Sequence, residues 1–339
     1  MISEKKTLIV LDTNALRSTL EGEVTYCSFE FGDPYNRLES FILDNGLSDL
    51  VRIAVPRIVI GELEKQKSRK YLADIEALSQ IYSRLSLMPH IKPSNVKLPK
   101  RDFDCKSHIN QLTERYLTEK RIQIIEIPSG GRLKGFFERI MERALERQPP
   151  FRASQKYSDV GFKDALIWES ILSFERIKAF NKIILLTGDT GLNNPECKKE
   201  FENKIKRFLS IQQSADFVVE ELNSDYAERI RYNDFVIFAH TDYFESYLQG
   251  QLSGKKHVLK DGKKYPISRF ETLNPCESVE TDEEYVEQEP EAEGEIVNST
   301  IKAYLKRRRG ETSIIVKART HIDENRNINR IDFDPELTD

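Results

Sequence analysis

The feature that most constrains the fold is a short apolar run that ends abruptly at an aspartate. Residues 7–11 read Thr-Leu-Ile-Val-Leu and are followed by Asp12. A continuous apolar run of this length is typical of a parallel strand that is buried on both faces. In open α/β sheets, ligands bind beyond the carboxyl ends of the strands, so Asp12 is predicted to face a ligand crevice. Residues 182–187 repeat the pattern and lead to Asp189, which predicts a second carboxylate at the same edge.

Strand-like and helix-like patterns alternate through the first two thirds of the chain. Short apolar runs predict strands, and apolar residues at helical spacing predict helices. The predicted strands span about 51–56, 122–127, 182–187 and 216–220, and the predicted helices about 36–45, 57–87, 102–121, 132–147, 158–179 and 196–209. This alternation is typical of a parallel sheet with helical crossovers. We therefore predict a three-layer α/β/α domain with a central parallel sheet over residues 1–222.

Residues 89–157 form a predicted insert whose charge differs from that of the whole chain. From residue 97 to residue 156 there are fourteen Lys or Arg and eight Asp or Glu, although the net charge of the chain is −4. Such a segment is either a solvated helical face or a basic wall that holds phosphates beside an active site. The net charge excludes a uniformly basic nucleic-acid binder and leaves local basic surfaces open.

The last third of the chain is predicted to be a helix followed by a small, mostly β region, residues 223–339. Its predicted elements are a helix at about 224–249, a hairpin at 256–267 with Asp-Gly at the turn, and strands at 301–305 and 313–318. Residues 277–295 contain ten acidic residues and no Lys or Arg, which is typical of a flexible loop. The Arg307-Arg308-Arg309 run is either a solvated turn or a nucleic-acid contact.

The cysteines and the apolar runs indicate the compartment. The four cysteines form no C-x-x-C pair: Cys27, Cys105, Cys197 and Cys276. A disulfide framework or a zinc site is therefore not expected, and a reducing cytoplasm fits this usage. No apolar run approaches the roughly 18 residues that a membrane span needs, and the first residues lack the apolar core of a signal peptide.

Four acids occupy positions that a parallel sheet would bring together. Two of them follow buried strands and two lie near the starts of helices: Asp12, Asp189, Glu62 and Asp164. Strand ends and the helix starts that follow them share one edge of the sheet. Clustered carboxylates raise one another's pKa unless a cation is present, and oxygen donors select Mg²⁺ or Mn²⁺. The sequence therefore predicts a site for a hard divalent cation.

Each of these acids also has a purely structural interpretation. Asp12 and Asp189 could cap turns, and Asp164 could interact favourably with the N-terminal end of a helix dipole. Glu62 has competitors in Glu64, on a different helix face, and in Asp159. Other nearby residues are open to both interpretations: Thr13, Asn14, Thr187 and Thr190 as supports of the carboxylates, Lys163 as a phosphate contact or a surface lysine, and Trp168 and Phe162 as core residues or stacking partners of a base.

The order and setting of the acids resemble those of the PIN-domain nucleases. The matching motifs are Leu11-Asp12-Thr13-Asn14, Gly61-Glu62-Leu63, Lys163-Asp164-Ala165-Leu166-Ile167 and Thr187-Gly188-Asp189. The resemblance covers about residues 7–222 without the insert. It implies a PIN-like α/β/α sandwich, a Mg²⁺ or Mn²⁺ cofactor, and hydrolytic cleavage of RNA or, less often, of DNA. Many bacterial members resemble VapC-type toxins, which are much shorter than this chain.

The expectation that follows is a metal-dependent endoribonuclease of the cytoplasm, acting on single-stranded RNA as a toxin or a defence effector. Asp12, Glu62, Asp164 and Asp189 would be both its catalytic residues and its metal ligands. A DNA nuclease of antiviral defence and a catalytically silent PIN-like binding module are the alternatives. The C-terminal region would take a regulatory protein or a second copy of the chain as its partner.

Overall fold

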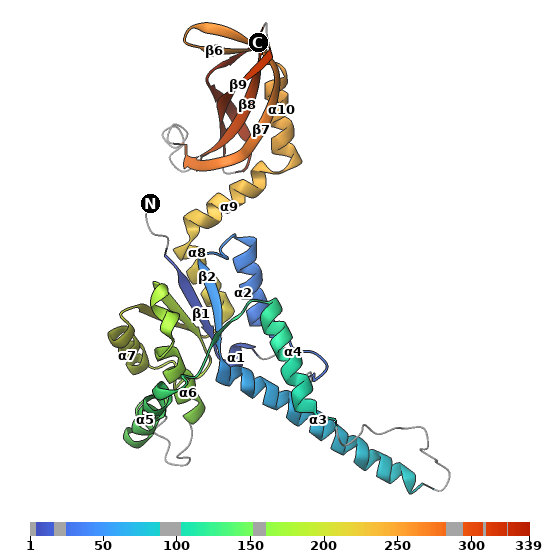
Figure 1. Cartoon of the computed structure of the whole chain (residues 1–339), viewed down its shortest axis with the longest axis vertical. Helices are drawn as coiled ribbons and strands as arrows, with labels where there is room; N and C mark the ends of the chain where they lie inside the picture. The colour runs from blue at the N-terminus through green and yellow to red at the C-terminus, as the bar shows by residue number, and fades with distance from the viewer. Residues whose placement is uncertain are drawn as a thin grey trace. The chain divides into compact units, whose positions relative to one another are not determined.

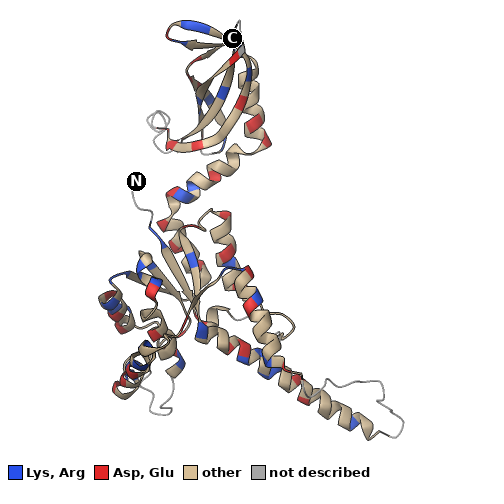
Figure 2. Cartoon of the chain, viewed as in Figure 1, with Lys and Arg blue, Asp and Glu red and all other residues tan. Residues whose placement is uncertain are grey.

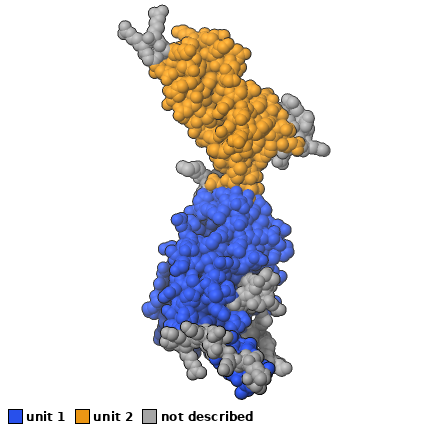
Figure 3. All heavy atoms as spheres, turned by 90° about the vertical axis from the view of Figure 1, so that its right-hand side faces the viewer, with its two compact units in different colours: residues 1–225 blue, residues 226–339 orange. Residues whose placement is uncertain are grey.

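The computed structural model describes residues 5–16, 25–88, 103–151, 161–282, 294–307, 310–323 and 325–339. The chain divides into two compact units, residues 1–225 and residues 226–339 (Figure 3). Each unit has its own sheet and its own core. No helix among the described residues is long and apolar enough to cross a membrane.

Unit 1 is built on a five-stranded sheet in which every strand pair is parallel. Its strand order is β3-β2-β1-β4-β5. The strands are β1 (Thr7–Leu11), β2 (Val51–Pro56), β3 (Gln123–Ile125), β4 (Lys182–Leu186) and β5 (Phe208–Gln212). Leu8, Ile9, Val10 and Leu11 of the central strand are 0% exposed, and burying one such side chain contributes about 1.5–3 kcal/mol. The predicted parallel α/β fold is confirmed, with β1 at its centre.

Helices cover the sheet of unit 1 (Figure 1). They are α1 (Thr13–Leu16), α2 (Asp33–Asp44), α3 (Arg57–Ser86), α4 (Cys105–Glu119), α5 (Gly131–Glu146), α6 (Phe162–Leu172), the 3₁₀ helix η1 (Glu175–Ala179), α7 (Pro195–Ile205) and α8 (Ala215–Asp225). The chain steps outward from β1 to β3 and then returns across the sheet to β4. Because crossovers are right-handed, the two directions place their helices on opposite faces. Accordingly α2 packs with α8, and α6 packs with α7.

The predicted last strand at 216–220 is wrong, because these residues lie in α8. Val218 and Leu222 are one helical turn apart and fully buried, so packing of this face overrides the strand preference of the Phe-Val-Val run. The edge strand is β5 instead. Lys206, with a φ of 59°, ends α7 before β5 begins, which shortens the helix predicted to reach residue 209.

Within the predicted insert, the described residues 103–151 form α4, β3 and α5. Figure 2 shows Lys and Arg interspersed with Asp and Glu along α3, α4 and α5 rather than gathered on one helix. Several basic residues of the insert are engaged within the protein: Arg139 and Arg143 both bind Glu169, and Arg132 binds Glu175. These three are therefore not available as a simple phosphate-binding wall.

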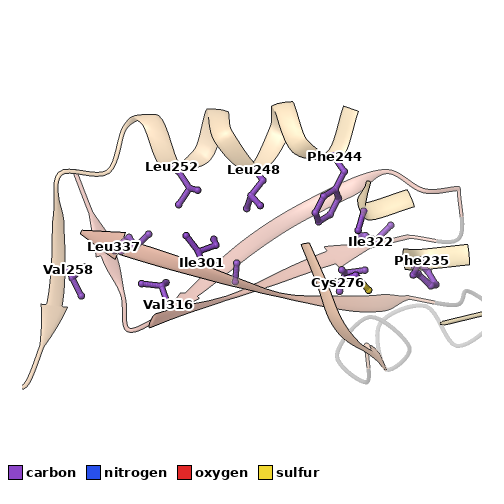
Figure 4. Packing of buried hydrophobic residues seen from close by; sticks show 14 of the residues in the cluster. Phe235, Phe244, Leu248, Leu252, Val258, Cys276, Ile301, Val316, Ile322 and Leu337 are labelled. Atoms are coloured by element: carbon purple, nitrogen blue, oxygen red, sulfur yellow. The ribbon is translucent and has the colours of Figure 1, made fainter. Parts of the chain in front are cut away.

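Unit 2 is a six-stranded antiparallel sheet covered on one face by a helix. Its elements are α9 (Ala227–Ala239), α10 (Asp242–Ser253), β6 (His257–Lys260), β7 (Lys263–Thr281), β8 (Glu295–Arg307), β9 (Gly310–Ile322), β10 (Ile328–Asp334) and β11 (Leu337–Thr338), in the sheet order β10-β9-β8-β7-β6-β11. Figure 4 shows Phe244, Leu248 and Leu252 of α10 pointing toward the sheet, where Ile301 and Val316 lie. The predicted β-rich character of this region is confirmed.

The details of unit 2 differ from the prediction at several places. The single helix predicted at 224–249 is two helices, because the Thr241 hydroxyl accepts a hydrogen bond from Phe244 N–H (3.3 Å) and starts α10. The hairpin turn is as predicted: Asp261 and Gly262 have φ values of 52° and 72°, as a type I′ turn requires. The strands predicted at 301–305 and 313–318 extend over the whole of β8 and β9, and β10 was not predicted.

The acidic segment 277–295 is not a loop throughout. Residues 277–281 belong to β7 and Glu295 begins β8, while residues 283–293 lie outside the described part. Asp282 and Glu295 are buried and are bound to His321 and Arg231 respectively. The loop prediction is therefore wrong at both ends, because cross-strand pairing and buried ion pairs extend the strands. Arg308 and Arg309, of the predicted basic turn, lie outside the described residues.

Candidate active site

Asp12 is fixed at the carboxyl edge where β1 and β4 lie side by side. Its backbone N–H donates to Leu186 O (3.1 Å) and so extends the pairing of the two strands. The Thr187 hydroxyl donates to Asp12 Oδ2 (2.9 Å), and the Thr13 N–H donates to Asp12 Oδ1 (2.6 Å). Asp12 is only 4% exposed. Both carboxylate oxygens are thus oriented by groups that directly follow the two strands.

Thr13 connects Asp12 to Glu62 of α3. The Thr13 hydroxyl donates to Glu62 Oε2 (2.9 Å), and Glu62 is partly buried. The competitor Glu64 faces α4 instead, where the Thr113 hydroxyl and Arg57 lie near it and where burial raises its pKa. Two residues along a helix do point to different faces, so Glu62 is the acid that α3 presents to Asp12. Asp159, the other competitor, lies outside the described residues.

Asp189 lies near Asp12 and also organises its own turn. Its backbone N–H donates to the Thr187 hydroxyl (3.0 Å). Its Oδ1 accepts hydrogen bonds from Gly191 N–H (2.6 Å) and Leu192 N–H (3.2 Å). The Thr187 hydroxyl therefore donates a hydrogen bond to the Asp12 carboxylate and accepts one from the backbone N–H of Asp189. Asp189 is thus a turn residue, as its structural interpretation predicted.

Asp164 is the third residue of α6 and is partly buried. Lys163, directly before it, places Nζ 2.8 Å from Glu62 Oε1, which brings the start of α6 to the same region. Trp168 is fully buried and its Nε1 donates to Glu200 Oε2 (2.9 Å), so it is a core residue. Phe162 is 46% exposed, and its prediction as a core residue is wrong.

The four predicted supporting residues divide into two pairs. Thr13 and Thr187 donate hydrogen bonds to carboxylates, as described, whereas Asn14 and Thr190 are exposed. Burial raises the pKa of Asp12 above its ordinary value of 3.8, hydrogen bonds from Thr13 and Thr187 lower it, and the carboxylates of Asp189 and Glu62 raise it. Asp189 and Glu62 are therefore close enough to Asp12 to influence it electrostatically.

The donor set has the chemistry of a hard-cation site, although the side chains do not form a complete coordination shell. Carboxylate oxygens prefer Mg²⁺ and Mn²⁺, and the mutual repulsion at Asp12 is what such a cation would relieve. Among the residues that the structure describes, no group of three or more Asp, Glu, His or Cys is arranged to hold a metal ion. The Asp189 carboxylate accepts hydrogen bonds within its own turn, and Glu62 binds Lys163.

Sequence reasoning missed two features that position the acids. A Cβ at Gly191 would lie 2.6 Å from Pro150 O and 2.9 Å from Asp189 Oδ1, and one at Gly161 would lie 2.9 Å from Pro150 O. The segment around Pro150 thus packs against both the Asp189 turn and the residue that precedes α6. Arg143, buried on α5, donates to Pro149 O (2.9 Å) and to Glu169 (2.7 Å). Its spacing from Phe136 and Ile140, on the buried face of α5, is the signal that could have revealed it.

The fold and the site together define a class of proteins: α/β domains with acids gathered at the carboxyl edge of a parallel sheet. Comparison with known families makes this specific. The family model of the PIN domain matches residues 9–192, a range that includes all four acids and the predicted insert. The chain belongs to the PIN-domain family, a family of nucleases. No match was found among curated proteins, and none among solved structures.

Proposed function

We propose that this chain is a metal-dependent endonuclease that hydrolyses phosphodiester bonds of single-stranded RNA. The observation that carries the proposal is the hydrogen-bonded array at the ends of β1 and β4. Thr187 and Thr13 hold the buried Asp12, and Thr13 also holds Glu62. An array of this kind keeps acids close together despite their mutual repulsion. That repulsion lowers the stability of the fold unless a bound cation neutralises it.

Asp12, Glu62, Asp164 and Asp189 would hold the cation, which we take to be Mg²⁺ or Mn²⁺. When bound, such an ion supplies an activated water and neutralises charge that develops on the phosphate. The residues of the chain contribute orientation: the Thr13 and Thr187 hydroxyls fix the carboxylates. Burial of Asp12 excludes water from one side of the acid array, which strengthens the electrostatic interactions there.

Single-stranded RNA is the substrate that membership of the family supports best. Basic groups of α4 and α5 that are not engaged with acids would follow the sugar-phosphate backbone. Contacts to phosphates orient a nucleic acid without reading its sequence, so binding should weaken steeply with salt and show little sequence preference. Nothing described at the site distinguishes a ribose from a deoxyribose, so the comparison of RNA with DNA belongs in the test.

The test is hydrolysis of end-labelled single-stranded RNA and single-stranded DNA with Mn²⁺. Wild-type protein should cleave the RNA internally, and Asp12→Asn and Asp164→Asn should not. Asp216→Asn, which makes the same chemical change on the exposed surface of α8, serves as the control and should remain active. Cleavage that survives in both site variants would refute the assignment, and preferential cleavage of DNA would replace the proposed substrate.

A further inference from the structure

Lys163 forms an ion pair with Glu62 across two helices. Its Nζ lies 2.8 Å from Glu62 Oε1, and the side chains of Lys163 and Glu62 are 62% and 18% exposed. The lysine therefore reaches from solvent into a largely covered carboxylate. It directly precedes Asp164 at the start of α6, so the pair lies within the acid array rather than on a remote surface.

The two oxygens of Glu62 have different partners. Oε2 accepts from the hydroxyl of Thr13 (2.9 Å), the residue next to Asp12. Oε1 accepts from Lys163 Nζ (2.8 Å) and, at the longer distance of 3.5 Å, from the uncharged Gln66 Nε2. The neutral hydroxyl fixes one oxygen, and the ammonium group neutralises the other. An ammonium is a compact cation on a flexible stem, so it can leave without disturbing the Thr13 contact.

We propose that Lys163 is the internal counter-cation of the acid array and must leave Glu62 before a divalent cation can bind there. This inference rests on the proposed function, because it concerns the same carboxylates. A divalent cation held by Glu62 would compete with the ammonium for this carboxylate, because two cations close to one carboxylate repel each other. A lysine that is mostly exposed loses little when it moves into water, so the exchange is readily reversible.

Removal of the competing charge should tighten metal binding. Replacing Lys163 with the uncharged Met leaves one more net negative charge at the array and removes the competitor for Oε1. We expect the dissociation constant for Mn²⁺ to fall by about 3- to 10-fold in Lys163→Met, the size expected for an exposed ion pair plus one nearby charge. Lys163→Arg keeps the positive charge and should restore the wild-type affinity to within about 2-fold.

The measurement is calorimetric titration of the metal-free full-length chain with MnCl₂. Lys178→Met is the matched control, because Lys178 is exposed on η1, before β4 begins, and thus at the opposite edge of the sheet from Asp12. Tighter binding in Lys163→Met alone supports the inference. An unchanged or weaker affinity in Lys163→Met overturns it, as does equal tightening in Lys178→Met, which would indicate net charge only.

Thermal unfolding gives a second readout that a merely structural lysine would not produce. Without metal, Lys163→Met should melt at or below the wild-type temperature, because Glu62 has lost its ion pair with Lys163. Saturating Mn²⁺ should then raise its melting temperature by more than it raises that of wild type. An equal rise in both proteins overturns the inference while leaving the nuclease proposal intact. Absence of Mn²⁺ binding by wild type refutes the nuclease proposal and the inference with it.

Discussion

Unit 1 contains two buried acids that are stabilised in opposite ways. Glu169 of α6 is 0% exposed and is bound by two guanidinium groups, from Arg139 and Arg143, each at 2.7 Å. Asp12 is 4% exposed, and its described hydrogen bonds come from the neutral Thr13 and Thr187. A buried carboxylate with cationic partners is a structural element, whereas one placed among other carboxylates is typical of a functional site.

Unit 2 supports the same distinction. Its buried Asp282 lies 2.6 Å from His321 Nδ1, and Asp332 lies 3.1 Å from His321 Nε2. These acids share the imidazole of His321, a side chain of the type that can carry a positive charge. His321 of β9 thus connects the residue that follows β7 with β10. Asp12 differs from both acids, because its described hydrogen bonds come from neutral groups and two neighbouring carboxylates raise its pKa.

The largest effect is expected on cleavage when Asp12 is neutralised. Asp12→Asn should lower the rate of RNA hydrolysis about 1,000-fold, since loss of a charged metal ligand removes several kcal/mol of transition-state stabilisation. The measurement is the initial rate at one Mn²⁺ concentration that saturates the wild-type protein, with circular dichroism to verify the fold. Glu169→Gln serves as the contrast: the part of it that remains folded should cleave within about 10-fold of wild type. Slower cleavage by folded Glu169→Gln than by Asp12→Asn would contradict the contrast between the two acids.

Neutralising Glu169, unlike neutralising Asp12, should affect stability more than cleavage. Glu169→Gln should lower the free energy of unfolding of unit 1 by about 3 kcal/mol, because it removes the buried negative charge that Arg139 and Arg143 share and leaves Arg143 only its ion pair with Glu200 among the described contacts. Urea unfolding followed by the fluorescence of Trp168, the single tryptophan, measures this. Glu138→Gln, at the exposed pair with Lys134, should change stability by less than about 0.5 kcal/mol. Equal losses in both variants would show that burial of the ion pair is not decisive.

The Asp189 turn should tolerate no side chain at Gly191. Gly191→Ala should cost about 1–3 kcal/mol of unfolding free energy, because its Cβ would lie 2.6 Å from Pro150 O, and it should also weaken Mn²⁺ binding by displacing Asp189. Gly61→Ala is the matched control, since nothing lies within 4 Å of its Cβ. In a helix interior that change should stabilise by about 1 kcal/mol. An unchanged free energy of unfolding in Gly191→Ala would contradict the close approach of Gly191 to Pro150 O.

The smallest expected effect is a gain in stability when Asp12 is neutralised. The sign of this change distinguishes a functional acid from a structural one. In metal-free protein at neutral pH, Asp12→Asn should raise the free energy of unfolding by an amount on the order of 1 kcal/mol. The pKa of Asp12 is raised by burial and by its neighbours, so ionisation costs the folded state stability as the pH rises from 3.8 through the raised pKa. The asparagine can still accept from Thr13 and can donate to Thr187.

Urea unfolding of wild type and Asp12→Asn at several pH values measures this effect. The gain in the variant should be full above the raised pKa of Asp12 and should shrink as the pH falls toward its ordinary value. Asp216→Asn, at an exposed position, should show no such gain. A loss of stability in Asp12→Asn at neutral pH would mean that Asp12 is a structural acid like Glu169.

Local patterns were sufficient to predict β1 to β4 of unit 1, most clearly β1 and β4, which are uninterrupted apolar runs, but they missed the edge strand β5. They failed at α8, where Phe217, Val218 and Val219 favour a strand locally but Val218 packs as part of a helical face. They also failed on the length of the strands in unit 2. There, pairing between Thr281 and Glu295, and between Glu295 and Ile322, decides where the strands end, and such pairing is invisible in a local window.

The site follows the same rule. The positions of Asp12, Glu62, Asp164 and Asp189 relative to strand ends and helix starts can be read from the sequence, because topology brings these edges together. The ion pair between Lys163 and Glu62 joins residues 101 positions apart, and the contact of Pro150 with Gly191 depends on how the insert returns to the sheet. Neither leaves a periodic trace in the sequence, so only the structure shows them.

The central claim is that the acids around Asp12 form a divalent-cation site, and calorimetric titration with MnCl₂ tests it most directly. Metal-free wild-type chain should show saturable binding that disappears in Asp12→Asn and persists in Glu169→Gln. No saturable binding by wild type, or binding that is unaffected by Asp12→Asn, would contradict the account.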